Sequence, residues 1–358
     1  MSFVEDERMG APPLKVGVVG LGYWGPSLLR ALFDLTDVEV TWLCDRDPER
    51  LARYERRYPG VSASRRVDEL LADSDVDAVV LATPVFTHSD LARKALMAGK
   101  HTFVEKPLAG SAAEADRLIE LAERSDRVLM CGHTFIYSPP VRAVKRLLEH
   151  EELGKIHFVS SSRVNLGLHQ RDVSVIWDLG PHDFSILLYW FDEVPTAVRA
   201  VGRDSIVKGI TDVAFVTLDF PSGVLANVEL SWLAPSKLRR TVIVGSKKMV
   251  VYDDGSPEPI RIFDHGVIYE DPETFGEYHL SYRTGDIVSP KLDTAEPISV
   301  EMQDFVASIR AGDTPEGHLE LARNVTQLVE AADASLAADR ERKAAHRMPF
   351  ERFAANLP

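Results

Sequence analysis

Residues 14–25 read LKVGVVGLGYWG, and this stretch decides the fold of the first part of the chain. The segment from Leu14 to Gly20 is rich in β-branched residues, which predicts a buried strand. Leucine and phenylalanine recur at helical spacing over residues 28–33, which predicts a helix directly after the strand. We therefore expect a strand, a glycine-rich turn and a helix in succession.

The glycines of the turn form the pattern G-x-G-x-x-G in this strand-to-helix context. Gly20 permits a tight turn, Gly22 lets the backbone approach a pyrophosphate, and Gly25 lets the helix pack close to the strand. The helix amino terminus then offers free N–H groups to the phosphates. We expect a dinucleotide here, with Tyr23 and Trp24 of the turn beside it.

An acidic residue stands where such a site binds the adenosine ribose. The next predicted strand, Val38 to Cys44, ends in Asp45, 20 residues after Gly25. An acid at this spacing favours NAD over NADP. Arg46 and the nearby Arg50 offer charge to a 2′-phosphate instead, and Asp45 is also a candidate N-cap of the next helix, so NADP stays open.

Strands and helices then alternate along the chain. The apolar strand 78–82 ends in Thr83 and Pro84, and His88 follows at the start of a helix. We expect Thr83 and Pro84 beside the cofactor, and His88 either beside it or in a structural role. Further helices and strands follow up to a strand over 128–131. This alternation predicts a doubly wound parallel α/β sheet, a Rossmann domain over residues 14–132, with ligands at the carboxyl ends of its strands.

One strand of this alternation, between the strands over 78–82 and 128–131, ends in an ionisable pair followed by proline. Residues 101–107 read HTFVEKP, and Pro107 ends the strand because it has no N–H to donate to the sheet. Lys106 and Glu105 thus stand at the ligand-binding edge. Taken alone, these residues favour a solvated surface lysine beside a strand-ending proline.

Composition places limits on function. The 358 residues suggest two domains, and a net charge of −14 argues against nucleic acid or a membrane surface as partner, although a local cationic pocket can still bind a phosphorylated substrate. The two cysteines, Cys44 and Cys131, fall in predicted buried strands, which fits a reducing, cytoplasmic setting. No apolar run reaches transmembrane length. Residues 1–13 are interpreted as a mobile leader and residues 346–358 as a tail.

The second half has a different pattern. After a helix at 140–149, strands are predicted near residues 156–164, 197–203, 213–220, 224–232, 240–245 and 248–252, and several alternate polar and apolar residues. Helices are expected at 299–311 and 319–342. We interpret residues 133–345 as an α+β domain with a large, mostly antiparallel sheet.

A second group of titratable residues lies between the first two of these strands, where residues 177–185 read WDLGPHDFS. Pro181 suits the first turn of a helix. Asp178 and His182 are four residues apart, so on a helix they share a face. A histidine can accept a hydroxyl proton near neutral pH, and a carboxylate can orient it. A capping aspartate and a packed histidine are the alternative.

The polar loop 165–174 precedes this motif. With Arg163, Asn165 and Arg171 it is interpreted as a substrate-binding segment, and Tyr137 is a further candidate for substrate contact or for packing. His169 and Asp172 of the loop, taken with Asp178 and His182, match no known ligand spacing, so we expect no metal.

Several motifs together resemble the Gfo/Idh/MocA oxidoreductases. They follow that family's order and spacing: the glycine turn, Thr83-Pro84 with His88, Glu105-Lys106-Pro107, and the Gly132-His133-Thr134-Phe135 segment with Pro139. Asp178, Gly180 and His182 match the family's D-x-G-x-H-x-x-D motif, whereas Ser185 stands where the final acid is usual. The match covers most of the chain.

The resemblance implies an NAD(P)-dependent oxidoreductase acting on CH–OH groups. The motif's lysine, here Lys106, lies between nicotinamide and the reacting hydroxyl in the family, and its bond to the following proline is often cis. His182 is then the proton acceptor, and Asp178 orients it or binds neighbouring hydroxyls. Residues 164–166 and 175–183 look more like the nucleotide-sugar branch, in which C3 of a hexose derivative is oxidised or reduced.

Other readings stay open at this point. An inositol or free-sugar dehydrogenase uses the same chemistry, a non-catalytic NAD(P)-binding regulator uses the same fold, and some relatives are hydrolases that use bound NAD as a redox relay. Similar proteins form dimers or tetramers through the open face of the second sheet, so we expect a homo-oligomer.

Overall fold

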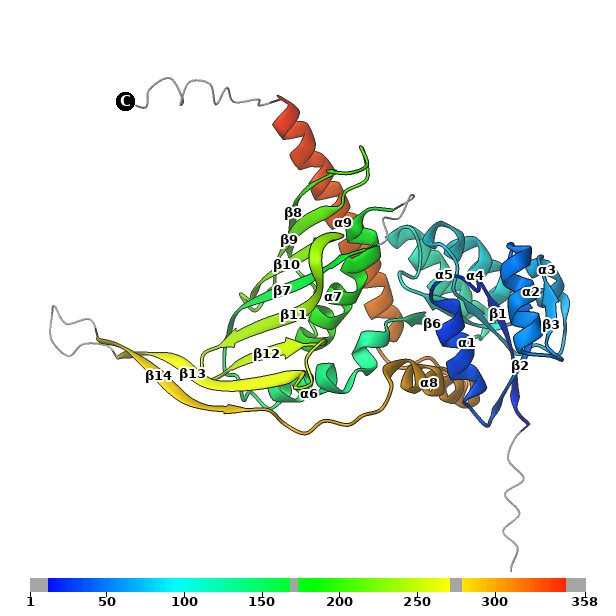
Figure 1. The fold of residues 1–358 in the computed structure, drawn as a ribbon, viewed down its shortest axis with the longest axis horizontal. Coiled ribbons are helices and arrows are strands. Elements are labelled where there is room, and N and C mark those ends of the chain that lie inside the picture. The colour runs from blue at the N-terminus through cyan, green and yellow to red at the C-terminus, as the bar shows by residue number, and fades with distance from the viewer. Residues whose placement is uncertain (1–11, 168–172, 271–278, 346–358) are drawn as a thin grey trace, which may run out of the picture. The chain divides into compact units, whose positions relative to one another are not determined.

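The computed structural model describes residues 12–167, 173–270 and 279–345, shown in Figure 1. Most of the predicted leader and all of the predicted tail lie outside these residues. The chain divides into two compact units, Met1–Tyr137 with Ala295–Arg323, and Ser138–Thr294 with Asn324–Pro358. We predicted one boundary near residue 133, and the division differs because a later segment packs with the first unit.

The first unit contains a six-stranded sheet in the order β3-β2-β1-β4-β5-β6, with every neighbouring pair parallel. This is the doubly wound order expected from the alternating pattern. The strands are β1 (Leu14–Val19), β2 (Val38–Cys44), β3 (Ser62–Ser64), β4 (Ala78–Leu81), β5 (His101–Glu105) and β6 (Leu129–Gly132). The short β3 was not predicted from the sequence.

Helices cover both faces of this sheet (Figure 1). They are α1 (Gly25–Phe33), α2 (Pro48–Arg57), α3 (Val67–Ala72), α4 (His88–Met97), α5 (Ala112–Ser125) and α8 (Pro297–Ala311), with short 3-10 turns η1 (Val85–Thr87) and η2 (Thr134–Tyr137).

Two apolar clusters lie on the two faces because strand side chains alternate. Val18 and Val80 join one cluster, with α1 and Phe305 of α8, whereas Val19 and Val79 join the other, with α4 and α5. Phe305 and its neighbours on α8 explain why residues 295–323 belong to the first unit.

The second unit contains an eight-stranded sheet in the order β14-β13-β12-β11-β7-β10-β9-β8. Among the described strands, β7 and β10 pair in parallel and the other neighbours pair antiparallel, so the sheet is mostly antiparallel as predicted. The strands are β7 (Ile156–Leu166), β8 (Ala197–Arg203), β9 (Val213–Asp219), β10 (Leu225–Ser231), β11 (Leu233–Gly245), β12 (Met249–Asp253), β13 (Ile260–Glu270) and β14 (His279–Val288).

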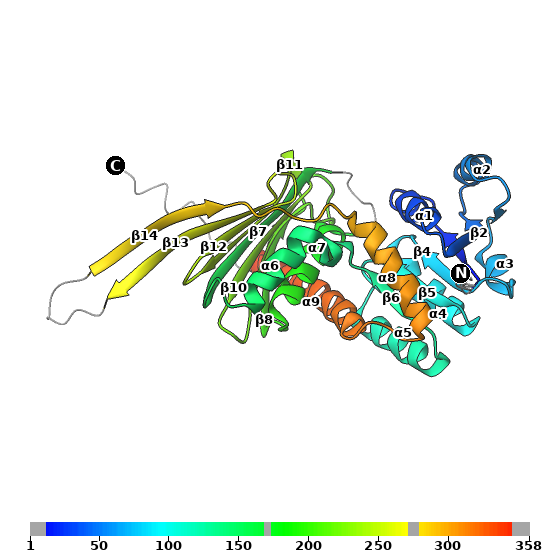
Figure 2. The same ribbon diagram turned by 90° about the horizontal axis from the view of Figure 1, so that it is seen from below.

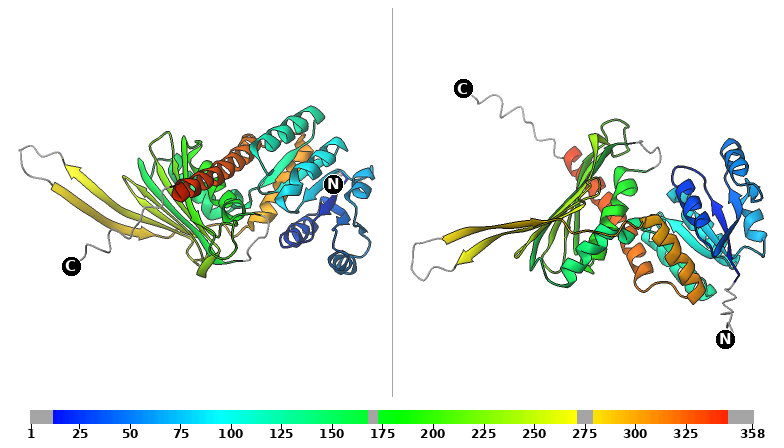
Figure 3. Two further views of the ribbon diagram at one scale, coloured as in Figure 1. Left: turned by 90° about the horizontal axis from the view of Figure 1, so that it is seen from above. Right: turned by 60° about the horizontal axis from the view of Figure 1, so that its bottom comes forward.

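The strands β13 and β14 were not predicted from the sequence. Their pairing register shifts between Phe263 and His265, which interrupts the alternation that marks a strand. Figure 3 shows that this two-stranded ribbon extends past the other strands of the sheet.

Helices lie against one face of the second sheet, as Figure 2 shows. They are α6 (Pro139–Glu149), α7 (Val175–Phe191) and the part of α9 (His318–Ala345) that belongs to this unit. Within the described ranges, none of the helices combines the length and the apolar character needed to cross a bilayer.

Candidate active site

The glycine turn of the first unit is built as its pattern predicts. Gly20 has a φ of +93°, and a Cβ there would lie 2.3 Å from the carbonyl oxygen of Ala82. A Cβ on Gly25 would lie 1.9 Å from the carbonyl oxygen of Gly20, so no side chain fits between the strand and α1. Both positions therefore require glycine for packing.

Gly22 differs from its two neighbours. A Cβ built on Gly22 would meet one guanidinium nitrogen of Arg50 at 3.8 Å, an ordinary contact distance. The chain thus leaves space above the backbone at this glycine, where a pyrophosphate would approach. Tyr23 is 88% exposed and Trp24 is partly exposed, so both stand at the surface of the turn. This turn fits a dinucleotide.

Asp45 follows β2 and is tied to the glycine turn. One carboxylate oxygen accepts a hydrogen bond from Leu21 N–H at 2.7 Å, and the other accepts from Asp47 N–H at 2.9 Å. Arg50 Nη1 lies 3.2 Å from the first oxygen. The side chain is buried by these contacts, which hold the acid beside the turn.

The alternative role of Asp45 as a helix N-cap is wrong. The N-cap of α2 is Asp47, whose side chain accepts from the N–H groups of Glu49 and Arg50. Asp47 lies two residues after Asp45, and we did not consider it as the cap from the sequence. Asp45 therefore contacts the glycine turn, where a bound ligand would also lie.

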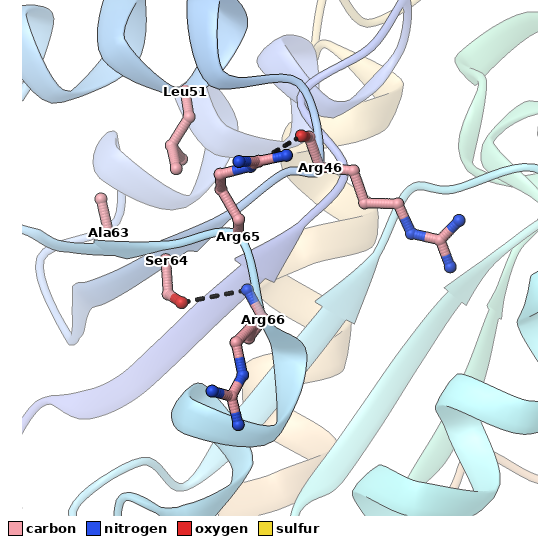
Figure 4. Close-up of a pocket in the computed structure, with 6 residues that line it drawn as sticks. All are labelled: Arg46, Leu51, Ala63, Ser64, Arg65 and Arg66. Atoms are coloured by element: carbon pink, nitrogen blue, oxygen red, sulfur yellow. Dashed lines mark hydrogen bonds between the residues drawn. The ribbon is translucent and has the colours of Figure 1, made fainter.

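A pocket of about 610 Å³ lies at the ends of β2 and β3 and is drawn in Figure 4. It is lined by Arg46, Leu51, Ala63, Ser64, Arg65 and Arg66. The Arg65 guanidinium lies against the Arg46 carbonyl oxygen, 3.1 Å from its Nε, while the Arg46 and Arg66 side chains extend in other directions (Figure 4). The three guanidinium groups do not converge on one point.

The ends of β4 and β5 bring two predicted motifs together. These strands pair in parallel, with Leu81 beside Val104, so Thr83-Pro84 and Lys106 follow at the same edge. The Lys106–Pro107 bond is cis, as the resemblance implied. Pro84 is exposed, and Thr83 and Lys106 are half-buried.

His88 lies at this edge of the sheet, but its side chain is buried and not exposed for contact with a cofactor. Its Nδ1 lies 2.8 Å from the carbonyl oxygen of Pro107 and its Nε2 lies 2.7 Å from that of Thr83. The ring is 1% exposed, and burial lowers its pKa while the two carbonyls oppose that shift.

Glu105 is buried next to Lys106. One carboxylate oxygen accepts a hydrogen bond from Lys106 N–H at 3.2 Å. A Cβ on Gly132 would lie 3.0 Å from the other oxygen, so a side chain at position 132 would crowd the carboxylate. Burial raises the pKa of Glu105 to about 7, and the positive charge of Lys106 opposes that rise.

Tyr137 lies in the interior of the first unit, where its hydroxyl donates to Asp304 at 2.7 Å. The sequence left two roles open for Tyr137, substrate contact and packing, and this hydrogen bond with its burial favours packing. Burial lowers the pKa of His133 to about 3. The ring of His318 contacts the backbone of Cys131, so this histidine is structural.

In the second unit, α7 carries Asp178 and His182 on one face. The helix begins at Val175, not at Pro181, which instead lies inside it. We predicted Pro181 in the first turn because proline is common there, but the preceding apolar residues extend the helix toward the amino terminus. Asp178 and His182 are both half-buried, as the four-residue spacing allows.

Trp232 positions Asp178, and sequence reasoning missed it. The indole Nε1–H donates to one oxygen of Asp178 at 2.9 Å, across 54 residues of chain. Trp232 follows β10, is 1% exposed, and its own backbone N–H donates to Asp212. A tryptophan at a strand end was the sequence signal, although nothing local to Trp232 names its partner.

Arg163 is not presented to a ligand. It is 4% exposed, and its Nε is bonded to Asp183 of α7 in a buried ion pair. Asp183 also accepts from Ser161 at 2.7 Å. Our hypothesis that Arg163 binds substrate is therefore corrected, because an arginine buried in such a pair stabilises the packing of α7 on β7.

Ser185 is equally internal. Its hydroxyl donates to the carbonyl oxygen of His182, one turn back, at 2.9 Å. The residue that replaces the family's usual acid is thus buried and bonded within its own helix. It offers no carboxylate and no outward hydroxyl.

The polar loop beside α7 is described only in part. Asn165 is half-buried at the end of β7, next to Gly167, whose backbone N–H donates to the Trp232 carbonyl. His169, Arg171 and Asp172 lie outside the described residues. The residues that the structure does describe contain no group of three histidine, cysteine or acidic side chains placed to hold a metal.

Two family models match the chain. Residues 14–133 match one described as "Oxidoreductase family, NAD-binding Rossmann fold", and residues 141–251 match "GFO/IDH/MocA C-terminal domain".

Individual proteins give the same picture over nearly the whole chain. A myo-inositol 2-dehydrogenase of Thermotoga maritima is 26% identical over 87% of this chain and 98% of its own length. The UDP-N-acetylglucosamine 3-dehydrogenase GnnA from Acidithiobacillus ferrooxidans has a solved structure that superposes with a TM-score of 0.74, at 25% identity, over 92% of this chain and 99% of that one. GenD2 from gentamicin A biosynthesis, solved in complex with NAD, has a TM-score of 0.78 at 25% identity, over 92% and 96%.

Proposed function

Because the chain belongs to the Gfo/Idh/MocA oxidoreductase family, with an NAD-binding Rossmann domain, we propose that it transfers a hydride between NAD and a ring carbon of a sugar. The favoured substrate is a nucleotide-activated hexose derivative, oxidised at C3 or reduced at a 3-keto group. The observation that carries the proposal is the position of Lys106, directly after β5 at the ligand edge of that domain.

The dinucleotide fits the residues of the first unit. The open side of Gly22 receives the pyrophosphate, Asp45 accepts the ribose hydroxyls, and the exposed Tyr23 and Trp24 flank the turn. Thr83, Pro84 and Lys106 line the edge where the nicotinamide is held. When bound, NAD supplies the hydride acceptor or donor.

NAD is favoured over NADP on two grounds. Asp45 is held beside the glycine turn, where its charge opposes a 2′-phosphate. Of the two arginines that the sequence offers to a 2′-phosphate, Arg50 is paired with Asp45 at 3.2 Å, and the Arg46 guanidinium points away from those of Arg65 and Arg66 (Figure 4).

The chain's own residues handle the proton. His182 accepts it from the substrate hydroxyl, and Lys106 donates a hydrogen bond to the same oxygen and stabilises its developing negative charge. Asp178, oriented by Trp232, binds a neighbouring hydroxyl or orients the His182 ring. In the reductive direction His182 returns the proton to the oxygen.

The nucleotide-sugar branch is supported by the likeness to GnnA and by the sequence of residues 164–166 and 175–183. It draws no support from Arg163, which is buried. The likeness to a myo-inositol 2-dehydrogenase over almost its whole length supports an inositol or free-sugar substrate as the second candidate.

The test is nicotinamide absorbance with a substrate panel. UDP- and dTDP-hexoses, their uronic acids, inositols and free aldoses are each assayed with NAD and NADP, for the wild type and for Lys106→Ala. We expect turnover of a nucleotide sugar with NAD, reduced at least about 100-fold in the variant, while NADH binding, followed by fluorescence, is retained.

Two results would change the proposal. Turnover of inositol or a free aldose alone keeps the chemistry and rejects the nucleotide-sugar assignment. Turnover that is unchanged in Lys106→Ala rejects the role of Lys106, whichever substrate is used.

A further inference from the structure

One buried imidazole joins two separate turns of the first unit. His88 is the first residue of α4, and its two ring nitrogens lie 2.8 Å from the Pro107 carbonyl oxygen and 2.7 Å from the Thr83 carbonyl oxygen. These partners are 19 and 5 residues away in the chain. The ring therefore bridges the turn after β5 and the turn after β4.

These two turns carry the motifs that the proposed function uses. Pro107 directly follows Lys106, so the carbonyl that His88 contacts is in the residue next to the lysine. Thr83 follows β4, the parallel neighbour of β5. The neutral ring donates its one N–H to one of these carbonyls, and its other nitrogen packs against the second. The ring therefore spans the two turns and fixes the position of the Lys106 turn relative to the adjacent strand end.

We propose that His88 is a positioning residue for hydride transfer, which holds the turn of Lys106 against the turn of Thr83 and does not itself contact cofactor or substrate. The inference rests on the proposed role of Lys106. Of the two roles that the sequence left open for His88, cofactor contact and a structural role, it favours the second.

The geometry argues for this role over general packing. Both ring nitrogens face backbone carbonyl oxygens, and the ring is 1% exposed, so no nitrogen is presented to a ligand. An apolar ring of the same size would fill the space and leave the carbonyl that accepts the ring N–H without its donor. Loss of the contact should therefore move the turn without opening a cavity.

His88→Phe is the first test variant, because it keeps the ring volume and removes both nitrogens. His88→Gln keeps one amide donor and carries the test if the phenylalanine variant fails to fold. His101→Phe is the matched control. His101 lies at the opposite end of β5, where its Nδ1 accepts from Val128 N–H at 3.0 Å.

The first measurement is hydrogen exchange, which needs no activity. In the wild type, Lys106 N–H donates to the Glu105 carboxylate, so exchange of this amide reports on the turn. We expect exchange in a peptide covering residues 105–110 to become about tenfold faster in His88→Phe and to stay unchanged in His101→Phe. Unchanged exchange in His88→Phe overturns the proposal, whatever the activity shows.

The second measurement is a double-mutant cycle with Lys106→Ala. His88→Phe alone should lower kcat by about 10- to 100-fold with little change in the KM for the sugar, because a small misplacement of a catalytic group is costly. In the Lys106→Ala background it should have no further effect on kcat.

The outcomes separate this inference from the proposed function. Effects of the two substitutions that multiply show that His88 acts by another route than Lys106 and overturn the proposal. If Lys106→Ala alone leaves turnover unchanged, the role of Lys106 is rejected, and the exchange measurement still decides whether His88 holds the turn.

Discussion

Single buried polar side chains orient the candidate catalytic groups in both units. Trp232 donates to Asp178 in the second unit, and His88 contacts the turn of Lys106 in the first. Each contact is a hydrogen bond made away from bulk water, where a missing partner is costly. The proposed catalytic groups thus have polar contacts with residues for which we propose no direct part in the reaction.

We expect Trp232→Phe to lower kcat/KM by about tenfold, because Asp178 loses the donor that sets its orientation. Steady-state kinetics with the substrate found in the panel measure this. Trp190→Phe is the control. Trp190 lies on α7, the helix that carries Asp178, but its indole N–H donates to the Val141 carbonyl at 2.9 Å. Equal losses of kcat/KM in the two variants would contradict the orienting role.

Glu105 gives a pH dependence of stability. Its folded pKa of about 7 is raised above the ordinary value of 4.5, so the folded state binds more protons between these values. The free energy of unfolding should therefore fall as pH rises from about 4.5 to 7, by about 3 kcal/mol from this group.

Urea unfolding at several pH values, for wild type and for Glu105→Gln, measures the effect. The difference between the two proteins should grow across this pH window, because glutamine does not titrate. A constant difference would show that Glu105 has an ordinary pKa in the folded protein.

At the scale of elements, the glycine turn between β1 and α1 divides its glycines between packing and ligand. Gly20 and Gly25 have no space for a side chain, whereas Gly22 has space that the chain does not fill. Glycine is thus required for packing at two positions of the pattern, and at the third it leaves space for a ligand.

Gly25→Ala and Gly22→Ala should accordingly differ. We expect Gly25→Ala to lower the melting temperature by several degrees or to prevent folding, since its Cβ meets the Gly20 carbonyl oxygen at 1.9 Å. Gly22→Ala should keep the melting temperature and weaken NADH binding by about tenfold or more. Thermal unfolding and NADH fluorescence measure the two quantities, and the reverse pattern would reject this division.

Element boundaries show where local reasoning stopped. The strands β1, β4 and β5 were predicted because β-branched runs and a following glycine or proline mark them. The start of α7 was misplaced because Pro181 is tolerated inside a helix whose other residues pack on the second sheet. The cap of α2 was assigned to Asp45 as an alternative, although the cap is Asp47.

At the scale of the whole molecule, the helices that the structure describes cover the second sheet on one face only (Figure 2). Several apolar side chains of its strands are exposed. Phe158, Leu225, Phe215 and Val201 are each more than 40% exposed. Leu225 pairs with Phe158, and Phe215 pairs with Val201 and with Glu229, which lies on the same face of β10 as Leu225. The four apolar side chains therefore lie on the same face of the sheet. This patch supports the proposed homo-oligomer.

We expect Phe215→Asp to shift the protein to a smaller species, because a charge in an apolar interface is costly. Light scattering after size exclusion measures the mass. Ile206→Asp is the control, since Ile206 is 64% exposed in the loop after β8 and outside the patch. A monomeric wild type, or a Phe215→Asp protein of unchanged mass, would contradict assembly through this face.

The sequence alone determined the Rossmann domain, the mostly antiparallel second sheet and the positions of Gly20, Gly22, Gly25 and Lys106 within them. These features depend on residues close together in the chain: glycines in a turn, apolar periodicity, and a proline that ends a strand. Local steric and hydrogen-bonding limits are readable from such neighbours.

Only the tertiary structure decided which side chains meet across long chain separations. Trp232 reaches Asp178 over 54 residues, Arg163 is buried against Asp183 instead of facing a ligand, and α8 returns to the first unit to pack with α1. Partners of this kind are selected by the packing of whole elements, because burial favours whichever arrangement satisfies the most polar groups and apolar surface together. No short stretch of sequence carries that information.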